Sequence, residues 1–150
     1  MTTEFCIAQL NLGYLKYDRF AKEMHSYQNQ LEIVMELALN DPGLLWIHED
    51  HTIEKVEKIW GKKAAANLST WINVDHLRSF MFTKLHMQVM ERSDDWFIPQ
   101  KEETFVMWYS PIGSKPSLEE AYDRLEYFRF NGQSEYAFND LFNYPKSPNI

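Results

Sequence analysis

Residues 5–12, FCIAQLNL, decide the fold. Side chains along this segment alternate between a wholly apolar set and a mixed set that includes Gln9 and Asn11, which is the two-residue period of a β-strand. A strand with one apolar face and one mixed face is typical of a sheet that has a core side and a wetter side. The segment therefore predicts a sheet whose first strand carries polar groups on one face.

The same patterns predict the other elements on either side of this strand. The predicted strands are 5–12, 44–48, 68–72 and 103–109, and the predicted helices are 18–39, 73–92 and one that opens at Ser117 and ends at Gly132. Asn73 predicts an N-cap, and Ser117 with Glu120 forms a capping box. Residues 51–66 predict an irregular connection.

The order of these elements predicts an α+β fold. A ferredoxin-like βαββαβ antiparallel sheet, with helices on one face plus a C-terminal helix, fits it best. We expect one domain over residues 1–150, with a core at 5–130 and a C-terminal extension at 131–150. Such a sheet leaves its second face uncovered, and aromatic residues there favour a homodimer through the sheet faces, a dimeric α/β barrel.

Composition narrows the function classes. The chain has 22 acidic and 15 basic residues, a net charge of -7 and 45% hydrophobic residues. This charge disfavours nucleic-acid binding, which depends on basic patches that neutralise phosphates. We expect no signal peptide and no membrane span. Cys6 is the only cysteine, so it has no intramolecular partner, and it indicates a reducing, cytoplasmic location.

His86 is the most informative polar residue. On a helical wheel it falls among Phe82, Leu85, Val89 and Met90, inside the apolar stripe of the helix predicted at 73–92. It could act as a general base, or it could be a structural histidine bonded to a backbone carbonyl or a tyrosine, which is the commoner situation.

Two groups of residues accompany it as candidates. The amides of Asn11 and Gln9 could orient a carbonyl or phenol, or could bond each other at the sheet surface. We take His86 and Asn11 as catalytic candidates, and the candidate substrate-binding residues are Gln9, Trp46, Trp71, Phe82 and Tyr109. Aromatic residues on strands more often belong to the core or a dimer interface than to a ligand site.

The run His48-Glu49-Asp50-His51 has the ligand types of a metal site. On a strand, residues three apart point to opposite faces, so the two histidines would share an ion only if the strand ended between them. We interpret the run as a solvated strand end and predict no metal.

Several short runs together resemble a known family: Ala8-Gln9-Leu10-Asn11, residues 67–71, Phe80-Met81-Phe82 with His86, Trp96-Phe97, residues 108–111 and Pro116-Ser117. They resemble an uncharacterised bacterial domain-of-unknown-function family placed among the dimeric α/β-barrel proteins, and the resemblance covers residues 5–130. That superfamily includes cofactor-free antibiotic-biosynthesis monooxygenases, haem-degrading enzymes, and isomerases or cyclases of aromatic intermediates.

The resemblance implies a cofactor-independent monooxygenase or isomerase that acts on an apolar or aromatic metabolite. It matches Asn11, Trp71 and His86 to an asparagine, a tryptophan and a histidine of the monooxygenase and haem-degrading branches. In those branches the histidine stands near the position of Met81, so His86 departs from the pattern and no cofactor is expected. The alternatives are a non-catalytic ligand-binding dimer and a haem-binding or haem-degrading protein.

Overall fold

Four antiparallel strands form one sheet in the order β2-β3-β1-β4. This computed structural model describes residues 3–48 and 53–149. The strands are β1 (Phe5–Tyr14), β2 (Leu44–Ile47), β3 (Ala64–Trp71) and β4 (Phe105–Pro111). The prediction of an α+β fold with a ferredoxin-like antiparallel sheet is confirmed.

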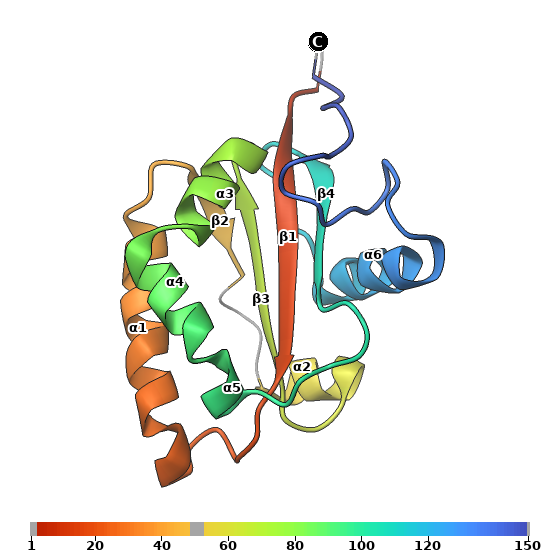
Figure 1. Cartoon of the computed structure of the whole chain (residues 1–150). Coiled ribbons are helices and arrows are strands. Elements are labelled where there is room, and N and C mark those ends of the chain that lie inside the picture. The colour runs from red at the N-terminus through yellow and green to blue at the C-terminus, as the bar shows by residue number, and fades with distance from the viewer. Residues whose placement is uncertain (1–2, 49–52, 150) are drawn as a thin grey trace.

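Helices lie on both faces of this sheet (Figure 1). They are the 3-10 helix η1 (Lys22–Met24) and the α-helices α1 (His25–Leu39), α2 (Ile53–Trp60), α3 (Val74–Met81), α4 (Lys84–Glu91), α5 (Ser93–Trp96) and α6 (Leu118–Asn131). The helices α1 and α3 to α5 cover one face, and α2 and α6 cover the other, as both views show. Within the described part of the chain, no helix is both long and apolar enough to cross a bilayer.

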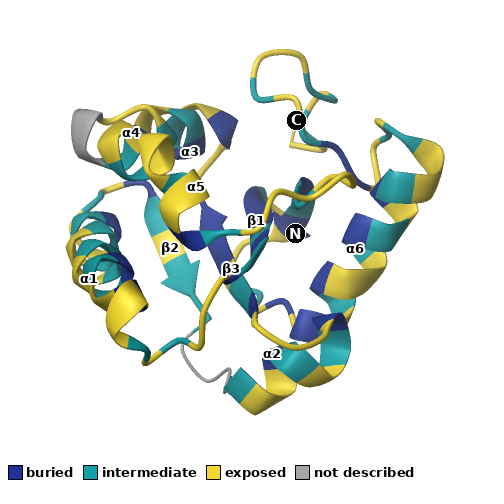
Figure 2. Cartoon of the chain, turned by 60° about the horizontal axis from the view of Figure 1, so that its bottom comes forward, coloured by how far each residue is buried: buried dark blue, intermediate teal, exposed yellow. Residues whose placement is uncertain are grey.

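The second face of the sheet is therefore covered, whereas the sequence predicted that it would be uncovered. Ala8, Leu10 and Leu12 point to this face and are 0–3% exposed, because residues of α2 and α6 pack over them. Figure 2 shows the buried side of α6 turned toward the sheet. The prediction of an uncovered face, on which the pairing of two sheets rested, was wrong, and the homodimer stays a prediction.

The long helix predicted at 73–92 is three helices. Asn73 caps α3 as predicted, since its side chain accepts a hydrogen bond from the backbone N–H of His76 at 2.9 Å. Thr83 then interrupts the helix: its hydroxyl donates to the carbonyl of Phe80 at 2.9 Å, and its side chain accepts from the backbone N–H of His86. A threonine that serves as a cap competes with helix continuation, so α4 starts anew at Lys84.

Two other boundaries also differ from the prediction. The first helix starts at His25 and follows η1, and neither has a side-chain cap. The connection at 51–66 contains α2, and β3 begins at Ala64 after a turn in which Gly61 and Lys63 have φ of 103° and 65°. The cap at Ser117 is confirmed, because its hydroxyl accepts from the backbone N–H of Glu120 at 3.0 Å.

The segment after α6 packs against the sheet edge. The backbones of Phe138 and Met107 exchange hydrogen bonds of 2.6 and 3.0 Å, so Phe138 continues the sheet beyond β4. The hydroxyl of Tyr109 donates to the carbonyl of Pro145 at 2.6 Å, and the Asn149 side chain bonds both backbone groups of Phe5. The segment covers the end of the same face that carries α3.

Candidate functional site

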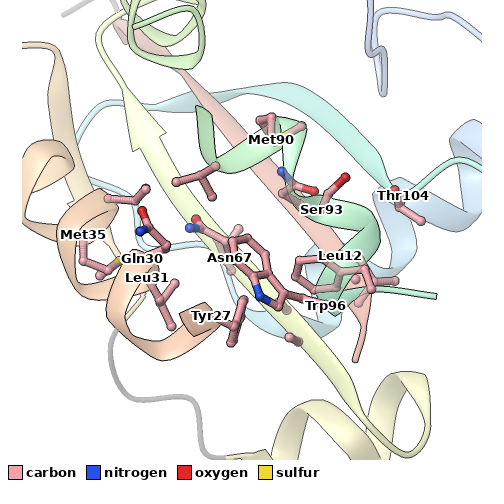
Figure 3. Close-up of a pocket in the computed structure, with 18 of the residues that line it drawn as sticks. Leu12, Tyr27, Gln30, Leu31, Met35, Asn67, Met90, Ser93, Trp96 and Thr104 are labelled. Carbon is pink, nitrogen blue, oxygen red and sulfur yellow. The ribbon is translucent and has the colours of Figure 1, made fainter. Parts of the chain in front are cut away.

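A cavity of about 460 Å³ lies between the sheet, α1 and the α4–α5 segment. Figure 3 shows side chains from these elements turned toward one space: Tyr27, Gln30, Leu31 and Met35 from α1, Asn67 from β3, and Met90, Ser93 and Trp96 from α4 and α5. The lining is mostly apolar. This volume lies within the range of small-molecule sites, about 300–1,000 Å³.

Small residues of the sheet lie beneath the cavity. Gly13 and Ala65 are register partners on β1 and β3, and both line the cavity. One end is walled by packed aromatic rings: Tyr27 meets Trp96 at 5.7 Å and Phe97 at 5.5 Å between ring centroids, both edge to face. Gly13 leaves room for the Phe97 ring, since a Cβ at this position would lie 2.5 Å from Phe97 Cε1.

The floor of the cavity carries two amides on the mixed face of the sheet. Asn11 and Asn67 are register partners on β1 and β3, and both line the cavity. The Gln9 amide donates to Asn67 Oδ1 at 3.0 Å and to Ser69 Oγ at 2.7 Å, and the Trp71 indole donates to Ser69 Oγ at 2.9 Å. This network holds Asn67 Oδ1, while Asn67 Nδ2 donates to no side chain or backbone group among the described residues.

His86 lies beside a smaller cavity of about 50 Å³. This side chamber shares five lining residues with the main cavity, Asn11, Val34, Met35, Ile47 and Asn67, so the two spaces adjoin. His86 Nδ1 is 2.9 Å from the carbonyl oxygen of Met81. Because a carbonyl only accepts, Nδ1 carries the proton and Nε2 presents its lone pair.

Burial lowers the pKa of His86, and the hydrogen bond to the Met81 carbonyl opposes this effect in part. The imidazole is therefore neutral at pH 7, since its ordinary pKa is already about 6.5. A neutral histidine with a defined tautomer has the protonation state that a general base needs.

Comparison with known proteins places the chain in a family. The model of a domain of unknown function, DUF3291, matches residues 6–149. The chain belongs to the DUF3291 family. This confirms the resemblance seen in the sequence, and no curated protein matches the chain.

Solved structures share the fold of this DUF3291 protein. A putative antibiotic biosynthesis monooxygenase from Nitrosomonas europaea aligns with a TM-score of 0.52 and 8% identity, over 78% of this chain and 97% of that one. Another, from Bacteroides thetaiotaomicron, aligns with a TM-score of 0.48 and 13% identity, over 77% and 91% of the two chains. At these identities the first likeness shows a common fold and nothing finer, and the second carries no argument.

The DUF3291 fold brings four of the candidate residues together. Gln9, Asn11, Trp71 and His86 all line the side chamber, and Asn11 also lines the main cavity. Asn67 joins them, although sequence reasoning did not single it out as a site residue. The sequence did place Asn67 at the start of the run that ends at Trp71. Asn67 is two residues from Ser69, so both side chains lie on the same face of the strand.

The other three candidates lie elsewhere. Trp46 pairs with Thr70 and so points to the opposite face, where it packs with the α2–α6 side of the core. Phe82 is 50% exposed and contacts Phe142. Tyr109 lies under the C-terminal segment, with its ring on Phe138. None of these three lines either cavity.

The described part of the DUF3291 chain contains no group of three or more metal-ligating side chains close enough to share an ion. The His48–His51 run lies mostly outside the described residues, with only His48 within them. Haem does not fit His86. The chamber beside that imidazole, about 50 Å³, is of the scale of one or two water molecules and has no room for a porphyrin.

Proposed function

We propose that the protein binds a small, largely apolar, aromatic metabolite in the main cavity and removes a proton from it. The supporting observation is the 460 Å³ apolar cavity with the Asn11 and Asn67 amides on its floor. Ligand pockets typically combine apolar walls with a few polar groups that fix orientation. In this proposal the two amides orient a carbonyl or phenol oxygen of the ligand, and the aromatic wall around Trp96 holds its ring.

His86 is the proposed base. The side chamber has polar walls from Gln9, Ser69 and His86 and enough volume for a bridging water, so a proton in the main cavity can reach Nε2 through one water. Amide N–H groups of Asn11 and Asn67 would stabilise the enolate or phenolate that proton removal creates. Such an anion is the starting point for either isomerisation or cofactor-independent oxygenation, the two reaction classes we propose.

Filling the cavity tests the binding step. Leu31→Trp places a large ring in the cavity from α1, and Ile33→Trp is the matched control, because Ile33 is on the same helix and is 42% exposed. The probe is N-phenyl-1-naphthylamine, a neutral apolar fluorophore, titrated at pH 7.5. We expect the wild type and Ile33→Trp to bind it alike and Leu31→Trp to bind at least about tenfold more weakly, about 1.4 kcal/mol.

Equal binding by Leu31→Trp and the wild type would place the probe outside the cavity and contradict the proposal. Far-UV circular dichroism of both tryptophan variants checks that each is folded, so that a loss of binding reports the cavity.

Turnover tests the role of His86. Mass spectrometry of purified protein identifies the aromatic compound that it retains, and that compound is then incubated with the wild type and with His86→Ala. The proposal predicts that both proteins bind it and that only the wild type converts it. If both bind it and neither converts it, the function is non-catalytic ligand binding.

A further inference from the structure

Arg19 is the single lysine or arginine among the described residues that line the main cavity. It lies in the connection between β1 and η1, lines the main cavity and is half-buried. Its Nε is buried and has no hydrogen-bond partner among the described residues. The terminal Nη groups are not buried in this way, and they are the part of the guanidinium that a ligand in the cavity could contact.

The buried Nε of Arg124 also lacks a hydrogen-bond partner among the described residues, but the four other arginines differ from Arg19 in forming ion pairs. Arg78, Arg92, Arg124 and Arg129 each form an ion pair with a carboxylate, at distances of 2.7 to 3.5 Å. Arg19 has no such pair within the described part of the chain. The chain has 22 acidic residues, yet the described residues that line the cavity include no aspartate or glutamate.

We propose that Arg19 binds a carboxylate of the ligand, so that the cavity takes an amphipathic acid: one carboxylate on an aryl or acyl body. This inference rests on the proposed function and narrows its ligand class. The planar guanidinium fork matches a carboxylate with two parallel hydrogen bonds, which its two terminal Nη groups can donate.

The charge of the site favours a carboxylate over a phosphate. One arginine balances one negative charge, whereas a phosphate dianion beside apolar walls needs more cations or a nest of backbone N–H groups. The net charge of -7 also disfavours a dianion. A monoanion with an apolar body fits both the single cation and the apolar lining.

Arg19 and Tyr27 both line the main cavity. The Arg19 guanidinium acts on the Tyr27 hydroxyl, because it lowers the pKa of Tyr27 against the larger upward effect of burial. The carboxylate end is thus near Tyr27. The residues of α1 that line the cavity extend from Tyr27 to Met35, eight residues or about 12 Å of helix. This direction takes the apolar body of the ligand over the Asn11–Asn67 floor.

Paired probes test the inference. The probes are 2-naphthoate and its neutral isostere 2-naphthamide, each titrated at pH 7.5 by displacement of N-phenyl-1-naphthylamine. The variants are Arg19→Gln and, as a charge-matched control, Lys22→Gln, because Lys22 is exposed at the start of η1 and lines neither cavity. We expect the wild type and Lys22→Gln to prefer the acid over the amide by at least about tenfold.

In Arg19→Gln the preference should vanish, while the affinity for the amide stays within about twofold of the wild type. Equal affinity for acid and amide in the wild type, or a preference that survives in Arg19→Gln, would overturn the inference. In that case binding of the neutral fluorophore and its loss in Leu31→Trp would leave the proposed function standing. If neither the fluorophore nor either naphthyl compound binds, both proposals fall together.

Discussion

Ser69→Ala tests the hydrogen-bond network that fixes the cavity floor. The Ser69 side chain is buried, with the residue 2% exposed, and its Oγ accepts from the Gln9 amide at 2.7 Å and from the Trp71 indole at 2.9 Å. Alanine removes the acceptor of both donors and keeps the backbone of β3. The change therefore isolates the hydroxyl oxygen.

The expected destabilisation is about 2 kcal/mol. Among the described residues Trp71 Nε1 has no second acceptor, so it bears the penalty of a buried, unpaired donor, about 1–3 kcal/mol. Gln9 loses less, because its amide keeps the 3.0 Å bond to Asn67 Oδ1. Urea unfolding at pH 7, followed by circular dichroism, gives the free energy of unfolding of each variant.

A double-mutant cycle with Trp71→Phe identifies the cause. Phenylalanine removes the indole donor, so Ser69→Ala should destabilise the Trp71→Phe background by about 1 kcal/mol less than the wild type. A loss below about 0.5 kcal/mol for Ser69→Ala in the wild type, or equal losses in both backgrounds, would refute the reasoning.

Three further predictions concern the cavity wall, the base and the C-terminal segment. In Gly13→Ala the new Cβ would lie 2.5 Å from Phe97 Cε1, so the ring must move; urea unfolding should show a loss of about 1–3 kcal/mol, and unchanged stability would contradict the close contact. Burial lowers the pKa of His86 in the folded state, so the unfolded chain binds a proton at this imidazole more readily than the folded chain does. The free energy of unfolding therefore decreases as pH falls from about 6.5 toward the folded pKa. His86→Gln should therefore lose less stability than the wild type between pH 7 and 5. The same dependence of the free energy of unfolding on pH in both proteins would contradict this prediction. Phe138→Ala, at a fully buried position, should destabilise by about 3–5 kcal/mol, and a loss below 1 kcal/mol would exclude this residue from the core.

The strands could be predicted from the sequence because burial on a sheet repeats every second residue. The alternation in residues 5–12 survives in β1, where the apolar set faces α2 and α6 and the mixed set faces the cavity. The side of the sheet that a helix covers has no such local signal. The apolar stripe of α6 was evident, but its position on the second face depends on tertiary packing.

The break between α3 and α4 was missed for a local reason. The apolar residues around Phe82 continue a helical period, and this pattern outweighed the capping tendency of Thr83. The consequence reaches the site. Where one straight helix would group His86 with Phe82, the break leaves Phe82 exposed and directs the His86 ring to the carbonyl of Met81.

The candidate site was predictable where a polar residue interrupts an apolar pattern. Gln9, Asn11 and His86 stand out for that reason, and all three line the side chamber. The sequence could not show that Trp71 lies at the side chamber and Trp46 on the opposite face, because strand register decides which face each one occupies. Arg19 gave no signal at all, since a lone arginine in a polar connection is ordinary until its neighbours in space are known.

The two faces of the sheet argue that the polar floor is kept for a ligand. On the face covered by α2 and α6, β1 places Ala8, Leu10 and Leu12, which simply fill the core. On the other face the same strand places Gln9 and Asn11 beneath α1, where apolar side chains would fill the space and remove the need for a hydrogen-bond network. The amides and the open space above them are explained together if a ligand occupies that space and bonds to them.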